Sequence, residues 1–375
     1  MEQANVLIIG GGVIGCAIAQ ALAERWDDVF VVEQNPRLGM ATSTRNSGVI
    51  HSGIYYPKGS LKARLCVEGN RLDYEFCATH NVPHRHNGKI VVASNAQEES
   101  QLAALKKRGE ENGVQGLRLI GPAEIRAREP HIRGTAALEV PSAGVLAPED
   151  FVRAFARLAT DRGASLVTHA RVTALEPAQN SIRATVRIGD ESVAQNETFE
   201  ARSVINAAGL YADEIAVMLG NRSWTIYPVR GEYCEIRGPR AFLVQNLVYP
   251  MPHVHGLSLG LHFTKTLWGT VLLGPTATYV NGKENYERAR LPIRDFVTSA
   301  KVLLPEIEQP DLQLAYSGLR AKLVPPEGKG IADFVITRDP QVPQAIQLVG
   351  IESPGLTSAP AIARYVAPMV SEILA

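Results

Sequence analysis

Three glycines near the N-terminus are spaced for a particular binding chemistry. Gly10, Gly12 and Gly15 follow an apolar run at residues 5–9, and the stretch 13–24 after them carries Ala, Ile and Leu at helical spacing. In a strand–turn–helix unit, this spacing permits a tight turn, close approach of a phosphate group to the backbone, and close packing of helix on strand. The pattern therefore predicts a phosphate-binding turn at the N-terminus of a helix.

An acidic residue completes the pattern. A second apolar run, 29–32, ends at Glu33, at the spacing from Gly15 where a carboxylate accepts hydrogen bonds from an adenosine ribose. Strand, glycines, helix, strand and acid in this order predict a dinucleotide-binding unit, in which Val13, Ile14 and Gln34 flank the ligand.

The same N-terminal stretch has one feature of an export signal, because residues 4–23 carry no charge. It lacks a preceding Lys or Arg, and three consecutive glycines interrupt it, so we interpret it as a Rossmann strand and helix and not as a signal peptide. No other run reaches the roughly 18 apolar residues of a membrane span. We expect a cytoplasmic protein without a transmembrane segment, and leave peripheral contact with the inner face of the membrane open.

Composition narrows the class of protein further. The 38 Lys+Arg balance the 38 Asp+Glu, and such a chain has no general attraction to nucleic acid. The four cysteines are scattered without a CxxC pair, which argues against a zinc site or a disulfide framework and fits a reducing compartment. The histidine groups at 80–86 and 253–255 have no close Cys or carboxylate partner, so we expect no metal site.

Three further segments favour FAD over NAD as the dinucleotide. The polar, glycine-punctuated run at 42–53 can wrap a large ligand with hydroxyls and backbone N–H groups, and a strand at 203–206 leads into a small-residue turn. Near the C-terminus, a buried strand at 348–351 leads through residues 352–357 into a last helix. The N-terminus of that helix suits the electron-rich N1/O2 edge of a flavin.

The motifs together resemble one enzyme superfamily. GGGVIG…VVE at 10–33, NAAGLYAD at 206–213 and SGLRAK…GIESPGLTSAPAIA at 317–363 are similar to FAD-dependent oxidoreductases of the D-amino-acid-oxidase-like superfamily. The run TSTRNSGVIHSGIYYPKGSLKARLCVEGN at 42–70, with GKIVVA, VRGEY and GLHFTKTLWGTVLLGP further on, most closely resembles the L-2-hydroxyglutarate dehydrogenases and oxidases. Residues 249–260 depart from that pattern, which leaves the substrate itself open.

The resemblance implies an α/β fold with two interleaved domains. A Rossmann-like FAD-binding domain with a parallel sheet is expected from residues 1–83, 145–223 and 316–375. An α+β substrate-binding domain with a mostly antiparallel sheet is expected from 84–144 and 224–315. Helices are expected within these two segments near 97–112 and 286–303.

The motifs and the resemblance also give an expected set of residues for non-covalently bound FAD. These residues are Gly10, Gly12, Val13, Ile14, Gly15, Glu33, Gln34, Thr42, Ser43, Arg45, Asn46, Ser47, Gly48, Val172, Ala207, Ala208, Gly209, Gly318, Arg320, Ser353, Pro354, Gly355, Leu356 and Thr357.

The implied reaction is oxidation of a small 2-hydroxy acid, similar to L-2-hydroxyglutarate, to the 2-oxo acid by hydride transfer to flavin N5. It needs a base for the hydroxyl proton and a cation for the carboxylate. We expect His51 as the base, His262 as the second choice, and Arg320 as the catalytic cation. Further candidates for contacting a small anionic substrate are Tyr56, Arg230, Tyr249, Lys265 and Lys322.

Two other functions fit the same sequence features. An FAD-dependent amine or amino-acid oxidase, of the glycine-oxidase or D-amino-acid-oxidase type, would share the fold and need no strong base. A flavin-binding protein without turnover would share the cofactor site. The electron acceptor is left open among oxygen, a quinone and an electron-transfer protein.

Overall fold

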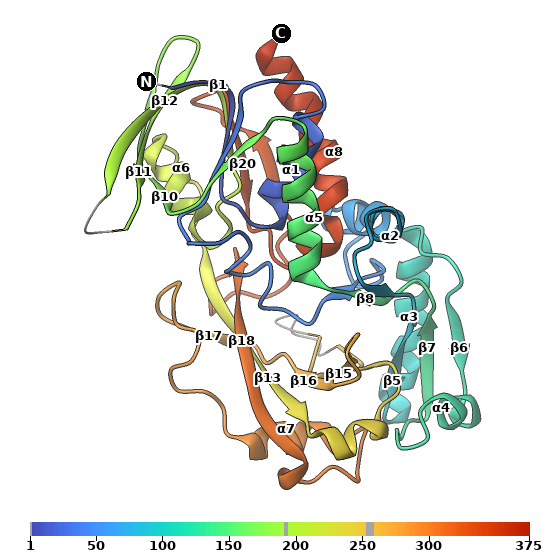
Figure 1. The fold of residues 1–375 in the computed structure, drawn as a ribbon. Coiled ribbons are helices and arrows are strands. Elements are labelled where there is room, and N and C mark those ends of the chain that lie inside the picture. Colours follow the sequence, from blue (N-terminus) through green and yellow to red (C-terminus); the bar gives the residue numbers. More distant parts are fainter. Residues whose placement is uncertain (1, 191–193, 253–258) are drawn as a thin grey trace.

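The computed structural model describes residues 2–190, 194–252 and 259–375 (Figure 1). His253 and His255, for which the sequence predicts no metal site, lie outside the described residues. Two large sheets and their helices make up most of the molecule, and both chain termini lie at the same end, beside the first sheet (Figure 1).

The first large sheet has eight strands and a parallel centre. Its parallel strands pair in the order β9–β2–β1–β12–β20. The antiparallel strands are β11, which pairs with β12, β10, which pairs with β11, and β19, which pairs with β20. The strands are β1 (Glu2–Ile9), β2 (Val29–Val32), β9 (Ser165–Val167), β10 (Ala170–Pro177), β11 (Ile182–Ile188), β12 (Gln195–Asn206), β19 (Val335–Arg338) and β20 (Ala345–Val349).

Both faces of this sheet are buried, which explains why its central strands are continuous apolar runs. Along β1, Val6 and Ile8 pack into one hydrophobic cluster and Leu7 and Ile9 into another. The first cluster includes α1 (Val13–Leu22), α2 (Leu61–His80), α5 (Pro148–Asp161) and α8 (Gly355–Leu374), and the second includes α6 (Ala212–Met218). A single 3-10 turn, η1 (Gly209–Tyr211), connects β12 to α6.

The second large sheet has nine strands, and its pairs are antiparallel except for β5 with β14. The order is β17–β13–β16–β15–β14–β5–β7–β6, with β18 paired to β13. The strands are β5 (Lys89–Ala93), β6 (Arg118–Ile120), β7 (Ala136–Val140), β13 (Tyr227–Ile236), β14 (Leu247–Pro250), β15 (His262–Lys265), β16 (Val271–Gly274), β17 (Thr278–Tyr279) and β18 (Leu312–Lys322).

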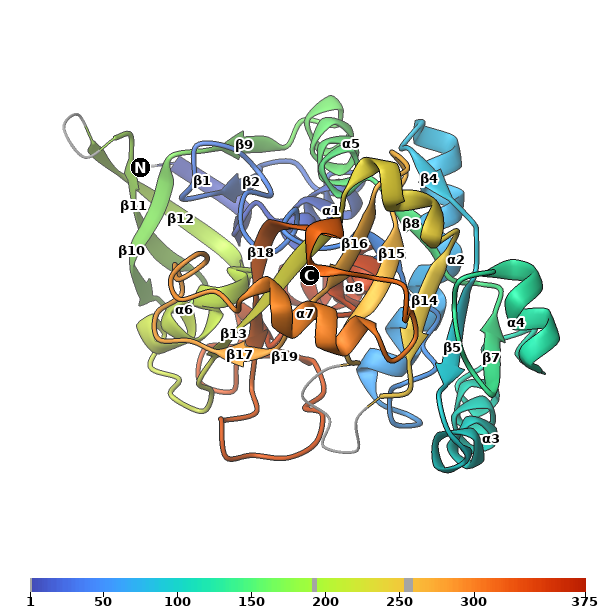
Figure 2. The same cartoon turned by 90° about the horizontal axis from the view of Figure 1, so that it is seen from below.

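Helices and a small sheet complete the chain. One face of the nine-stranded sheet packs against α7 (Ile293–Ala300), which crosses it in Figure 2. The opposite face packs against α3 (Ala96–Glu111). The other elements are α4 (Pro122–Arg128), η2 (Gly238–Leu243), η3 (Gln309–Asp311) and the small sheet of β3 (Val49–Ile50), β8 (Gly144–Leu146) and β4 (His84–Arg85).

The predicted fold class, a parallel sheet with helices and a second, mostly antiparallel sheet, is confirmed. The predicted helix at 286–303 was wrong in extent, because the helix covers only Ile293–Ala300. Pro292 occupies its N-cap position, and a proline disfavours helical backbone in the residue before it. Among the residues that the structure describes, none of the helices combines the length and apolar character needed to span a membrane.

Candidate functional site

A cavity of about 740 Å³ is lined by residues from both large sheets. Its volume lies in the range of pockets that take small molecules and cofactors. Most of the residues predicted to hold FAD line it, from Gly10 and Glu33 of the first sheet to Gly318 and Arg320 of the second. Gly15, Gly48 and Thr357 support this lining without belonging to it.

The glycine turn has the close contacts that its spacing predicts. Gly10 has a φ of +110°, and a Cβ at this position would lie 2.4 Å from the carbonyl oxygen of Ala207, in the turn after β12. A Cβ on Gly15 would lie 1.9 Å from the carbonyl oxygen of Gly10. Neither position can hold a side chain, so the backbone of the turn stays open where α1 begins.

Glu33 lies beside this turn at the end of β2. Its Oε2 accepts a hydrogen bond from the backbone N–H of Gly11 at 2.8 Å, and its Oε1 accepts one from the N–H of Asn35 at 2.8 Å. Two backbone donors hold the buried carboxylate at the carboxyl end of the strand, where α/β sheets bind ligands.

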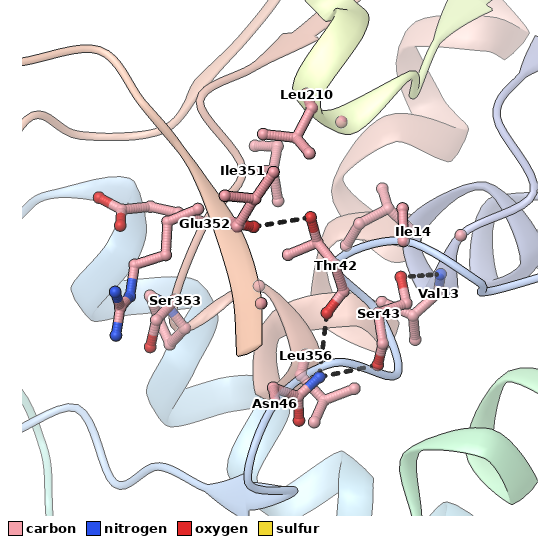
Figure 3. A pocket seen from close by; sticks show the side chains of 18 of the residues that line it. Val13, Ile14, Thr42, Ser43, Asn46, Leu210, Ile351, Glu352, Ser353 and Leu356 are labelled. Atoms are coloured by element: carbon pink, nitrogen blue, oxygen red, sulfur yellow. Dashed lines mark hydrogen bonds between the residues drawn. The ribbon is translucent and has the colours of Figure 1, made fainter. Parts of the chain in front are cut away.

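The polar loop at 42–48 contacts both α1 and β18, and Thr42, Ser43 and Asn46 of this loop are labelled in Figure 3. Ser43 Oγ accepts a hydrogen bond from the N–H of Val13 at 2.9 Å, at the first residue of α1. Thr42 Oγ1 donates to the carbonyl oxygen of Leu319 on β18 at 2.9 Å. A Cβ on Gly318 would lie 2.0 Å from the carbonyl oxygen of Arg45, so loop and strand touch along their backbones.

These features fit a bound FAD. The open N-terminus of α1 offers backbone donors to a pyrophosphate, and Glu33 offers acceptors to a ribose. The loop at 42–48 and the turn Ser353–Leu356, both labelled in part in Figure 3, line the same cavity.

Two histidines face the cavity from different elements. His51 follows β3, and its Nε2 lies 3.3 Å from Ser353 Oγ, while its buried Nδ1 has no hydrogen-bond partner among the described residues. His262 opens β15, stacks on Tyr249 with ring centroids 3.8 Å apart, and has its Nδ1 3.0 Å from the carbonyl oxygen of Gly260. That carbonyl can only accept a hydrogen bond, so Nδ1 carries the proton and Nε2 the lone pair.

Both histidines are uncharged at neutral pH. Burial lowers the pKa of His51 well below its ordinary value, and the charge of Lys89 and the neighbouring imidazole of His262 lower it further. Burial also lowers the pKa of His262 to about 3, although its contact with Gly260 acts in the opposite direction. An uncharged imidazole is the form that can accept a proton.

A cationic cluster lines the cavity near the histidines. Arg320 donates from Nη1 to the carbonyl oxygen of Thr276 at 3.1 Å. Lys62 and Lys322 share Glu352, with their Nζ atoms 3.0 and 3.2 Å from Oε1. Burial by itself raises the pKa of Glu352, but the two lysines outweigh it and hold that pKa below its ordinary value. Two ammonium groups on one carboxylate leave a net positive charge.

Strand alternation decides which predicted cations reach the cavity. Gly231 and Tyr233 of β13 line it, so Arg230, which directly precedes Gly231, points to the other face, where it pairs with Glu232 at 2.9 Å. A Cβ on Gly231 would lie 2.9 Å from Arg320 Nη1, which places the guanidinium on the cavity face.

Lys265 is a second predicted cation that the structure does not bring to the cavity. It is three residues beyond His262 on β15, and its Nζ donates to the carbonyl oxygen of Ala241 at 2.7 Å. Tyr56 and Tyr249, also predicted as substrate contacts, do line the cavity.

The sequence prediction missed several residues at this end of the cavity. Lys62 and Glu352 lie within the motifs quoted above. Lys89 lies behind the rings of Tyr55 and Tyr249. It is a lone charge at the start of an apolar strand, and this contrast in the sequence could have indicated a buried lysine. Within residues 2–190, 194–252 and 259–375, no group of three His, Cys, Asp or Glu side chains could hold a metal ion.

The chain is similar to proteins of known activity over nearly its whole length. The model of the family described as FAD dependent oxidoreductase matches residues 5–369. The mitochondrial L-2-hydroxyglutarate dehydrogenase of Mus musculus is 32% identical, over 96% of this chain and 86% of that protein. The L-2-hydroxyglutarate dehydrogenase of Escherichia coli (strain K12) is 30% identical, over 99% of this chain and 94% of that protein.

A solved structure agrees with these relatives. The dithionite-reduced L-alpha-glycerophosphate oxidase of Mycoplasma pneumoniae with FAD bound has a TM-score of 0.88 and 27% sequence identity, and the match covers 99% of this chain and 95% of that chain. The family match, the relatives and a cavity lined by most of the residues predicted to hold FAD agree, and the chain therefore belongs to the family of FAD-dependent oxidoreductases, with FAD as its cofactor.

Proposed function

We propose that this oxidoreductase converts a small anionic 2-hydroxy acid, of the L-2-hydroxyglutarate type, to the 2-oxo acid. The observation that carries the proposal is the joint presence of uncharged histidines and a cationic cluster in one cavity. The names of the two relatives, both L-2-hydroxyglutarate dehydrogenases, support the same substrate class.

Each part of the substrate has a candidate partner. Arg320 holds the carboxylate next to the hydroxyl carbon, because its planar fork can donate two hydrogen bonds to one carboxylate. His51 accepts the hydroxyl proton at Nε2, the ring nitrogen that contacts Ser353 at the cavity. The net charge of Lys62, Lys322 and Glu352 attracts a second anionic group of the substrate. Bound FAD supplies the acceptor for the hydride.

Anaerobic reduction of the bound flavin tests the substrate class. L-2-hydroxyglutarate is expected to bleach the flavin absorbance, and the D-enantiomer, glycerol 3-phosphate, glycine and D-amino acids are expected to do so far more slowly. Bleaching by glycine or a D-amino acid alone would replace the proposal with the amine-oxidase alternative. A flavin that no member of this panel reduces would contradict both.

Arg320→Met is expected to raise KM for the hydroxy acid about 100-fold, since truncating one member of a buried charge pair costs several kcal/mol. Arg320→Lys keeps the positive charge but loses the two-pronged donor geometry of the guanidinium, so its KM is expected to lie between those of the wild type and Arg320→Met. Arg294→Met is the control, because that side chain is 79% exposed on α7. Steady-state kinetics give the values, and an unchanged KM in Arg320→Met would rule out this anchor.

We propose the two-domain division predicted from the sequence, with one boundary moved. The eight-stranded sheet draws its strands from the FAD-binding segments, and the nine-stranded sheet draws most of its strands from the substrate-binding segments. The predicted boundary at 315/316 falls inside β18, which pairs with β13 from Leu312 to Lys322. We therefore assign all of β18 to the substrate-binding domain.

A cytoplasmic location remains our proposal. The four cysteines, at 16, 66, 77 and 234, are all free and buried, which suits a reducing compartment. Fractionation of cell lysate tests it, with recovery in the supernatant expected and recovery in the membrane pellet contradicting it.

A further inference from the structure

Lys89 is a buried cation that the proposed reaction does not yet use. It opens β5, its side chain is 3% exposed, and its Nζ has no hydrogen-bond partner among the described residues. Two aromatic faces flank the ammonium, at 4.6 Å from the ring centroid of Tyr55 and 4.7 Å from that of Tyr249. Burial of an unpaired ammonium costs several kcal/mol, so this lysine weakens the fold that contains it.

The two rings connect Lys89 to the reactive end of the cavity. Tyr55 and Tyr249 both line the cavity, and Tyr249 stacks on His262 at 3.8 Å. The charged and titratable groups around this point are His51 on the loop after β3, His262 on β15, Arg320 on β18, and Cys66 and Asp73 on α2. Lys89 thus lies behind an aromatic wall, with the histidines on the cavity side.

Protons are shared unequally in this cluster. Burial lowers the pKa of Lys89 to about 7. Burial, and then the Lys89 charge among other groups, lowers the pKa of His51 well below its ordinary value and that of His262 to about 3. When the pH falls below 7, the proton therefore goes to Lys89 before it goes to either histidine.

We propose that Lys89 is a positioning residue for the oxidation, a buried cation that holds a proton behind the tyrosines and keeps the cavity histidines free to accept the substrate's proton. The catalytic role of Lys89 rests on the proposed function. Its electrostatic effect on the histidines does not, because that effect is a property of the protein without substrate. A low dielectric between the groups makes such an effect strong.

Histidine titration in Lys89→Met tests the proposal without any substrate. The FAD-loaded enzyme is labelled with ¹³C-histidine, and the signals of His51 and His262 are assigned by their loss in His51→Asn and His262→Asn. Removal of the ammonium is expected to raise the proton affinity of both rings about tenfold or more. Lys89→Arg keeps the charge and is expected to titrate as wild type does. Lys301→Met, an exposed lysine paired with Glu308, is the control.

The outcomes separate this inference from the proposed function. Unmoved histidine signals in Lys89→Met, or equal shifts in Lys89→Met and Lys89→Arg, would overturn it even if 2-hydroxy acids are oxidised. If they are oxidised, the acidic limb of kcat/KM is expected to move to higher pH in Lys89→Met and to return in Lys89→Arg. A merely structural lysine would alter activity without moving that limb.

The thermal stability of Lys89→Met gives an independent measurement. The variant is expected to fold, because it removes a buried charge. Because the pKa of Lys89 is lowered from 10.5 to about 7, the unfolded chain binds more protons between these values. The loss of folding free energy caused by the buried Lys89 charge is therefore full below pH 7 and decreases as the pH rises to 10.5. Lys89→Met is expected to raise Tm most below pH 7, and a lowered Tm there would contradict an unpaired buried charge.

Discussion

Replacing His51 with asparagine is expected to lower the rate of flavin reduction by the hydroxy acid about 100- to 10,000-fold, the range that a positioned general base contributes. Asparagine keeps a polar side chain but cannot accept a proton at neutral pH. The FAD content should stay near the wild-type level, because the contact with Thr357 is made by the backbone N–H, which the variant keeps, and asparagine can still contact Ser353. Anaerobic stopped-flow absorbance measures the rate, and the flavin-to-protein absorbance ratio measures the cofactor.

His262→Asn is the matched comparison for this prediction. His262 is held by Gly260 and by stacking on Tyr249, so we expect it to orient the substrate and its loss to cost less than the loss of His51. A larger loss of the flavin-reduction rate in His262→Asn than in His51→Asn would make His262 the base and His51 the orienting residue. Near wild-type rates in both variants would refute general-base catalysis by histidine and would favour an amine substrate, which needs no strong base.

Replacing Gly15 with alanine is expected to weaken FAD binding about 100-fold or more. A Cβ there would lie 1.9 Å from the carbonyl oxygen of Gly10, and that backbone oxygen can move only if the turn moves. Overpacking of this kind costs about 3 kcal/mol, and each 1.4 kcal/mol corresponds to roughly a tenfold change in affinity. Fluorescence titration of the apoprotein with FAD measures the dissociation constant.

Alanine substitutions at two other glycines serve as comparisons for Gly15→Ala. A Cβ on Gly12 would meet only the hydroxyl of Ser43 among the protein atoms, at 2.9 Å, so Gly12→Ala is expected to disturb the backbone of the turn less than Gly15→Ala does. A Cβ on Gly238 would meet nothing within 4 Å, and Gly238→Ala is expected to bind FAD as wild type does. Equal affinities for Gly15→Ala and Gly238→Ala would show that the close contact does not shape the cofactor site.

The cofactor turn could be predicted from the sequence because its geometry is local. Gly10 and Gly15 meet within one strand–turn–helix unit, and Glu33 ends the next strand in the chain. A spacing along the chain therefore fixes a spacing in space. The apolar runs at 5–9 and 29–32 lie within β1 and β2 for the same reason, since a local run of apolar residues is enough to predict a buried strand.

The reactive end of the cavity depends on tertiary structure. Glu352 meets Lys62, which is 290 positions away, and no local pattern specifies that pair. Residue type alone could not distinguish Arg230 from Arg320, because both are arginines in strands that carry a family motif. The pairing of Val229 with Arg320 and of Gly231 with Gly318 turns Arg320 toward the cavity and leaves Arg230 on the other face.

The sequence by itself thus determined the cofactor, the fold class and the family, since these follow from local motifs, from the resemblance of those motifs to one superfamily, and from apolar periodicity. Tertiary structure decided which cations, histidines and tyrosines share the cavity, and it brought Lys89 behind them. The physical reason is that side chains on a strand alternate between faces, so the register between distant strands chooses the face that each one reaches.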